Sequence, residues 1–302
     1  MNPHLNDLQR RFAGADFLSF VELAPDFIAI QVRTEFSAAT IALQGAHVMT
    51  WQPNNQPPVV WLSKGAKFAP GKSIRGGVPL CWPWFGPHAS ESAYPGHGFA
   101  RTIPWALLSA LKLPDGRVRL EFEPILNDTA HLQWPYPATV RNSIIVGQAL
   151  EIDLTTSNTG GTRFELGQAL HTYFEIGDIG QISVVGLAGC EYIDKVDGAS
   201  RKKQAGTVTF NGETDRIYLD TAGWCEIHDP QLKRRIVITS TGSRSTVVWN
   251  PGAEKAEKMG DFGTDGWRAT VCVESANAAK DVLTLAPGES HRLAVQYRAI
   301  PL

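Results

Sequence analysis

Alternation between apolar and polar residues over short segments constrains the fold of this chain most strongly. Apolar residues, several of them β-branched or aromatic, occupy every second position in Phe27–Val32, Ala149–Thr155 and Arg292–Tyr297. A period of two is typical of strands that turn one face to a core, as in antiparallel sheets. The same pattern recurs in Arg117–Glu123, Gln181–Val185 and Arg235–Thr239. The sequence therefore predicts an all-β, mainly antiparallel protein.

Turn signals separate these segments, and helical signals are few. Residues that preset φ or tolerate positive φ break the alternation at 114–116, 158–161, 211–212 and 287–288. The residue pattern suits a short helix at Asn6–Phe12 and a helical turn at Ala253–Met259. Neither segment is long enough to cover a sheet, and no linker-like stretch divides the chain. We expect residues 1–302 to form a single β-sandwich domain rather than a parallel α/β fold.

Charge and composition point to a small ligand. The 302 residues carry a formal net charge of -2, with Lys and Arg scattered along the chain, so we expect neither nucleic acid nor a membrane as partner. Met1–Leu18 lacks the features of a signal peptide, and no run approaches the roughly 18 apolar residues that span a bilayer. The four cysteines lie far apart without a C-x-x-C pair, which is typical of buried thiols in a reducing compartment. We therefore expect a cytoplasmic protein, and a monomer.

Two glycine-containing segments hold the first candidate site residues. Lys72–Gly86 combines Arg75 with three aromatic side chains, which could line a pocket or form a core under a rigid loop. Pro95–Arg101 places His97 between two glycines, where little steric cover is expected. Arg75 and Arg101 together offer planar forks that suit a phosphate, although each alone could make a surface ion pair.

Two further candidates interrupt apolar strands. Alternation places His171 on one face of its strand-like run, together with Ala169 and Tyr173. Histidine titrates near neutral pH, so His171 could hold and release a proton, or it could be an ordinary core residue. Glu274 follows the apolar run 271–273. A buried carboxylate needs a partner or a cleft, so Glu274 is either part of a structural ion pair or a functional acid or base.

Asp194 and Lys195 are a weaker candidate pair, because they could bind ligand hydroxyls or merely end a strand. Motifs for other chemistries are missing from the sequence. It contains no H-E-x-x-H, no zinc-spaced His/Cys set, no P-loop, no G-x-G-x-x-G opening a helix and no G-x-S-x-G. The sequence therefore indicates neither a metal nor a nucleotide cofactor.

Taken in order, these segments resemble the aldose 1-epimerase superfamily, and specifically its hexose-6-phosphate mutarotase (glucose-6-phosphate 1-epimerase) branch. The resemblance covers nearly the whole chain, through Gly45–Val48, Ser73–Pro79, His97–Arg101, His171–Phe174, Tyr192–Lys195, Val248–Pro251 and Val273-Glu274. It implies a galactose-mutarotase-like β-supersandwich with the sugar in a cleft on one sheet. Leu170 stands where mutarotases of free sugars often carry Asn, which fits the phosphosugar branch better.

The resemblance also implies an activity, the metal-independent interconversion of the α and β anomers of aldose 6-phosphates, glucose 6-phosphate foremost. The implied roles are general acid for His171, general base for Glu274, sugar binding for His97 and Asp194, and 6-phosphate binding for Arg75 and Arg101. A free-aldose 1-epimerase and a non-catalytic carbohydrate-binding or sensing protein remain alternatives. A glycosidase has less support, because that chemistry generally uses paired carboxylates.

Overall fold

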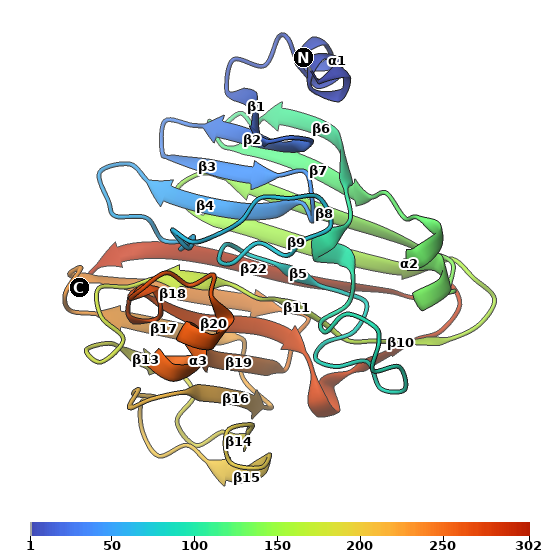
Figure 1. Cartoon of the computed structure of the whole chain (residues 1–302). Helices are drawn as coiled ribbons and strands as arrows, with labels where there is room; N and C mark the ends of the chain where they lie inside the picture. The colour runs from blue at the N-terminus through green and yellow to red at the C-terminus, as the bar shows by residue number, and fades with distance from the viewer. Residues whose placement is uncertain (1) are drawn as a thin grey trace.

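Two layers of antiparallel sheet make up most of the computed structural model, which describes residues 2–302 (Figure 1). The first layer begins with a sheet of β1 (Leu18–Ala24), β2 (Phe27–Arg33), β3 (Ser37–Ala42) and β4 (His47–Pro53). It continues with β15 (Ser200–Lys203), β14 (Glu191–Asp194), β16 (Thr214–Leu219), β19 (Ser245–Asn250), β20 (Thr270–Asn277), β11 (Gln168–Leu170) and β5 (Leu80–Cys81), in spatial order. Strand β12 (Tyr173–Glu175) also pairs with β20. Isolated bridges such as Val60↔Phe174 connect the two parts of this layer.

The second layer is one eight-stranded sheet that runs behind the first. In spatial order it contains β13 (Ser183–Val185), β17 (Trp224–Asp229), β18 (Arg234–Thr241), β22 (Ser290–Pro301), β9 (Leu150–Asn158), β8 (Ala138–Val146), β7 (Val118–Pro124) and β6 (Trp105–Lys112). A small pair, β10 (Phe164–Leu166) and β21 (Leu283–Leu285), lies apart from both layers. The predicted all-β, mainly antiparallel fold is confirmed.

The hydrophobic core fills the space between the layers. It includes Ile41 of β3 and Val273 of β20 from the first layer, and Phe122 of β7 from the second. Polar contacts also cross it, because Trp82 Nε1 donates to Thr156 Oγ1 of β9 over 3.0 Å. Burial on one face is the physical reason for the alternation in strands such as β9, whereas β19 and β20 are buried on both faces.

The short helices lie at the margins of the sheets (Figure 1). They are α1 (Pro3–Arg11), α2 (Asp128–Gln133) and α3 (Gly252–Met259), with 3-10 turns η1 (Ala100–Thr102), η2 (Gly266–Ala269) and η3 (Ala279–Asp281). Helix α1 begins before the predicted segment because the Asn2 side chain accepts from two backbone amides at its start. The sequence prediction missed α2, which is capped by Asn127. Within residues 2–302, no helix is long and apolar enough to cross a membrane.

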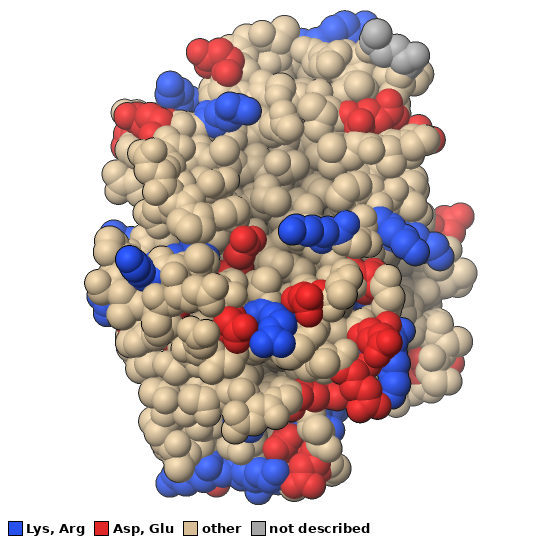
Figure 2. All heavy atoms as spheres, turned by 60° about the vertical axis from the view of Figure 1, so that its left-hand side comes forward, with Lys and Arg blue, Asp and Glu red and all other residues tan. Residues whose placement is uncertain are grey.

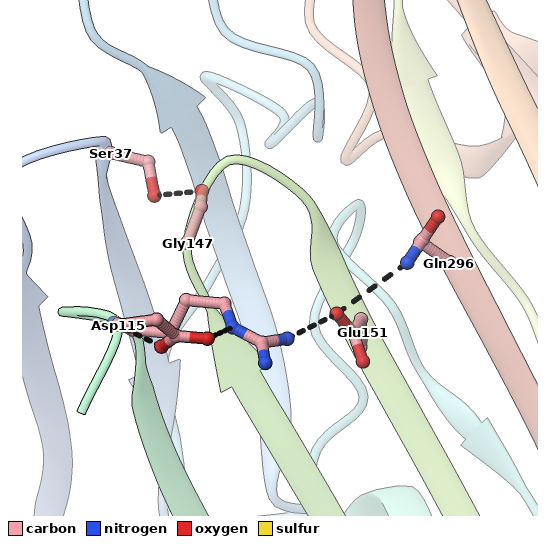
Figure 3. A network of polar contacts seen from close by, with 6 residues as sticks. Ser37, Asp115, Gly147, Glu151 and Gln296 are labelled. Atoms are coloured by element: carbon pink, nitrogen blue, oxygen red, sulfur yellow. Dashed lines mark hydrogen bonds and ion pairs between the residues drawn. The ribbon is translucent and has the colours of Figure 1, made fainter. Parts of the chain in front are cut away.

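Polar contacts connect strands of the second layer with one another and with β3 of the first layer (Figure 3). Arg117 donates to Asp115 and to Glu151 of β9, each over 2.8 Å, and Gln296 of β22 also donates to Glu151. Ser37 Oγ donates to the carbonyl of Gly147 over 2.7 Å, which joins β3 to the β8–β9 turn. These contacts tie neighbouring strands together away from the candidate site.

Charged side chains of both signs are interspersed on the face shown in Figure 2, without one large patch of a single sign. This distribution agrees with the scattered charges of the sequence and its formal net charge of -2. A broad cationic stripe of the kind that binds nucleic acid does not appear on that face.

Candidate active site

Strand register brings His171 and Glu274 face to face. Strand β11 pairs Leu170 with Ser275, and β12 pairs Tyr173 with Cys272 of the same strand β20. The register is the same on both sides of the short break between β11 and β12, so His171 falls opposite Glu274. The His171 Nε2 atom lies 3.3 Å from Glu274 Oε1. His171 is 9% exposed and Glu274 is 1% exposed, which leaves the pair largely shielded from water.

The break between β11 and β12 is held by specific hydrogen bonds. The His171 amide donates to the carbonyl of Pro79 over 3.1 Å, and the Thr172 amide donates to that of Leu170 over 3.0 Å. The Thr172 hydroxyl contacts the Tyr297 hydroxyl of the second layer at 2.6 Å. Thr172 therefore points into the core, whereas the His171 ring stacks on the Tyr173 ring with centroids 5.0 Å apart. The alternation of faces predicted for this segment is confirmed.

Burial favours the uncharged form of both members of the pair. It raises the pKa of the Glu274 carboxyl well above its usual value, and the nearby negative charge of Asp215 adds to this shift. Burial also lowers the pKa of His171 well below 6.5, and electrostatic coupling to His97 and Arg101 adds to this shift. In the free protein, burial thus favours a protonated carboxyl on Glu274 and a neutral imidazole on His171.

His97 approaches the pair from the loop after Pro95. The adjacent Gly98 has φ +71, and a Cβ there would lie 1.9 Å from the Trp82 carbonyl oxygen, so only glycine fits. His97 itself has φ +67, a strained conformation for a non-glycine residue. Its ring lies 5.8 Å from the His171 ring and 4.8 Å from the Phe85 ring. Burial, together with Arg101 and Lys195, lowers the pKa of His97 to about 4.

The two arginines near His171 are held by different contacts. Arg75 donates to Asp261 Oδ1 over 3.0 Å and to Tyr173 Oη over 2.9 Å. Arg101 donates to the carbonyl of Gly96 over 2.8 Å, and its buried Nε has no hydrogen-bond partner in the described part of the chain. Both charges lower the pKa of His171, so both guanidinium groups are close to the imidazole.

The structure does not bring Asp194 to this cluster. Register pairs Asp194 with Arg216, and Arg216 lies across from Val248, which packs in the core. Asp194 therefore lies on the same sheet face as Val248, and Glu274 lies on the opposite face. Lys202 Nζ donates to its carboxylate over 2.8 Å. The expected contact with sugar stays a prediction that this geometry does not support.

Three residues near the pair were not among the predicted site residues. Asp215 shares a sheet face with Trp249 and Cys272, and its charge acts on Glu274. Lys195, noted in the sequence only as a weak candidate, lies close enough to His97 to affect its pKa. Asp215 had no sequence signal, because its place depends on strand register. Cys272 did have a sequence signal, because it stands two positions before Glu274 in a strand and must lie on the same face.

Cys272 also completes a group that could hold a metal ion. Its Sγ, a ring nitrogen of His171 and a carboxylate oxygen of Glu274 all lie within 4.8 Å of one another. A separate hollow of about 700 Å³ is bordered by Phe85, Trp134 and Phe164. Neither His171 nor Glu274 lines that hollow, so it is not where the pair acts.

Comparison with known proteins identifies relatives over most of the chain. The family model described as aldose 1-epimerase matches residues 29–298. A protein of Escherichia coli (strain K12), named "Putative glucose-6-phosphate 1-epimerase", is 43% identical over 243 residues, 80% of each chain. The crystal structure titled as a "putative mutarotase" from Salmonella typhimurium has a TM-score of 0.89 at 36% identity and covers 98% of this chain and 100% of that one. A galactose mutarotase-like protein from Lactobacillus casei shares the fold, with a TM-score of 0.69 at 15% identity and coverage of 90% and 100%.

Proposed function

The chain belongs to the aldose 1-epimerase family, and from that premise we propose that it interconverts the α and β anomers of hexose 6-phosphates. The observation that carries this proposal is the 3.3 Å approach of His171 to Glu274 in a largely buried site. The relatives that are 41–43% identical over 80% of the chain carry the name "Putative glucose-6-phosphate 1-epimerase". Glucose 6-phosphate is therefore the substrate that we assign.

Anomer exchange requires one group to take the proton of the C1 hydroxyl and another to protonate the ring oxygen. The pyranose then opens to an aldehyde, rotates about C1–C2 and closes on the other face, with the two proton transfers reversed. His171 and Glu274 are the pair that we assign to these transfers. Each positioned acid or base contributes about 10²- to 10⁴-fold to such a rate.

The charge state of the pair depends on what occupies the site. With His171 as acid and Glu274 as base, the reaction begins from the imidazolium–carboxylate form, whereas the free site favours the neutral form. Both forms carry the same number of protons, so the shift of one proton between the two side chains is enough to interconvert them. A phosphate dianion on Arg75 and Arg101 offsets the positive charges that lower the pKa of His171. Binding of a phosphorylated sugar thus favours the protonated imidazole of His171, the proposed proton donor.

Arg75 and Arg101 are the groups that we assign to the 6-phosphate, with His97 contacting the sugar. Arg75 is held in place by Asp261 and Tyr173, which leaves guanidinium hydrogens free for a ligand. Arg101 contributes a buried Nε hydrogen with no partner among residues 2–302. A buried donor of this kind gains most from a charged acceptor.

Exchange spectroscopy of glucose 6-phosphate anomers by NMR tests this function. We expect the purified protein to raise the exchange rate far above that in buffer, and galactose to be exchanged more slowly than glucose 6-phosphate. A faster rate with galactose would instead identify a free-aldose 1-epimerase. Binding without any increase in rate would identify a carbohydrate-binding protein and refute the proposal.

We also infer a cytoplasmic location and a monomeric state for the enzyme. Support for the location comes from the four cysteines, all free thiols and three of them buried. Fractionation of cells and size-exclusion chromatography test the two inferences separately.

A further inference from the structure

We propose that Cys272, His171 and Glu274 form a binding site for a thiophilic divalent cation such as Zn²⁺, and that its occupation blocks anomer exchange. One donor atom of each residue lies within 4.8 Å of the other two. The metal site rests on this geometry, whereas the block of exchange rests on the proposed function. The enzyme itself needs no metal in this scheme, so the cation acts as an inhibitor.

The ligand set suits zinc by type and by spacing. Thiolate sulfur, imidazole nitrogen and carboxylate oxygen bind Zn²⁺ at about 2.0–2.3 Å, which puts neighbouring ligand atoms about 3.5 Å apart in a tetrahedron. His171 Nε2 and Glu274 Oε1 are already 3.3 Å apart. From separations of at most 4.8 Å, the sulfur needs to approach by up to about 1.3 Å, a movement within the reach of a side-chain rotation. Three protein ligands leave a fourth position for water.

An unpartnered polar atom in the cluster gives independent support. Glu274 Oε2 is buried and has no hydrogen-bond partner among residues 2–302, so this carboxyl group has an oxygen free for a ligand. Buried polar atoms without partners are rare, because each costs free energy that a ligand can recover. His171 is the more exposed member of the cluster at 9%, so a ligand enters from its side.

Charge selects which cations can bind. Arg75 and Arg101 repel any cation near His171, so a hard ion held mainly by charge gains little here. Zn²⁺ binds Cys272 as a thiolate, whose proton is released to solvent, and Glu274 as a carboxylate, so two negative charges neutralise the ion. His171 contributes a neutral imidazole. We therefore expect Zn²⁺ and Cd²⁺ to bind, and Mg²⁺ not to compete.

Cysteine variants separate this site from adventitious thiol binding. Cys272→Ser removes the proposed ligand, and Cys190→Ser removes the only partly exposed cysteine and is the matched control. We expect Zn²⁺ to inhibit the wild-type protein and Cys190→Ser equally. Loss of a contact around a metal ligand costs about 10- to 100-fold in affinity, so loss of the ligand itself costs at least about tenfold. For each variant, the rate with Zn²⁺ is divided by the rate of the same variant without Zn²⁺. If Cys272→Ser does not fold, Cys272→Ala takes its place.

A spectroscopic titration tests the site without using turnover. Cd²⁺ bound to a thiolate gives an ultraviolet charge-transfer band, which we expect in wild type and in Cys190→Ser but not in Cys272→Ser. A band that depends on Cys190, no band in wild type, or equal Zn²⁺ inhibition of all variants would overturn the proposal. A Cys272-dependent band in a protein without epimerase activity would retain the metal site and refute only the proposed function.

Discussion

Replacing Glu274 by Gln is expected to lower activity and to raise stability at the same time. The change keeps the shape of a side chain that is 1% exposed but removes its ability to exchange a proton. Loss of one proton-transfer group lowers the rate of anomer exchange by about 10²- to 10⁴-fold. The stability effect has the opposite direction because burial of this carboxyl in the native state is unfavourable.

The pH dependence of stability follows from the raised pKa of Glu274. Above pH 4.5 the unfolded chain ionises this carboxyl, whereas the folded protein retains the proton, so the free energy of unfolding falls as pH rises. Each pH unit up to the folded-state pKa costs about 1.4 kcal/mol. Glu274→Gln removes this loss, so its stability relative to wild type is expected to increase by up to that amount per pH unit.

Urea unfolding between pH 5 and pH 8, together with NMR exchange rates, measures both effects. Glu257→Gln, which removes a carboxylate from the exposed surface of α3, is the control and should change neither quantity appreciably. A stability difference independent of pH would show that the native carboxyl is ionised and well partnered. Retained activity in Glu274→Gln would exclude it from the proton transfers.

Three further variants test other parts of the site. Asp215→Asn removes a charge that raises the pKa of Glu274, so the alkaline limb of the rate–pH profile should move to lower pH. An unchanged limb would contradict the electrostatic effect of Asp215 on Glu274. Arg101→Met should reduce kcat/KM for glucose 6-phosphate about 10- to 150-fold more than for glucose, the value of a hydrogen bond to a charged group, and equal losses would exclude phosphate contact. Tyr297→Phe removes the 2.6 Å contact with Thr172 and should cost about 1 kcal/mol in urea unfolding, with a lower kcat if this contact positions His171.

Some features of the site were predictable because they depend only on local sequence. Alternation correctly placed His171 and Tyr173 on one face, since successive side chains of a strand must point in opposite directions. The requirement that a buried carboxylate have a partner or a cleft correctly marked Glu274 as unusual. The same local rule places Cys272 beside Glu274, although the sequence alone gave no reason to link the thiol to His171.

Strand register decided what local sequence could not. Asp194 and Lys195 are adjacent in the chain, yet Asp194 faces the core side with Arg216, while Lys195 affects His97. Asp215 acts on Glu274 only because β16 pairs with β19 in one register, and a shift by one residue would turn its side chain to the other face.

The sequence by itself determined the strand-rich class of the fold and the segments that carry reactive groups, because both follow from a period of two and from residue type. Only the tertiary structure decided that an imidazole and a carboxyl about a hundred positions apart come within 3.3 Å. It also decided their charge states, since these depend on burial and on charges contributed by other strands and loops. Proximity between distant segments is set by the pairing of whole strands, and no single segment encodes that pairing.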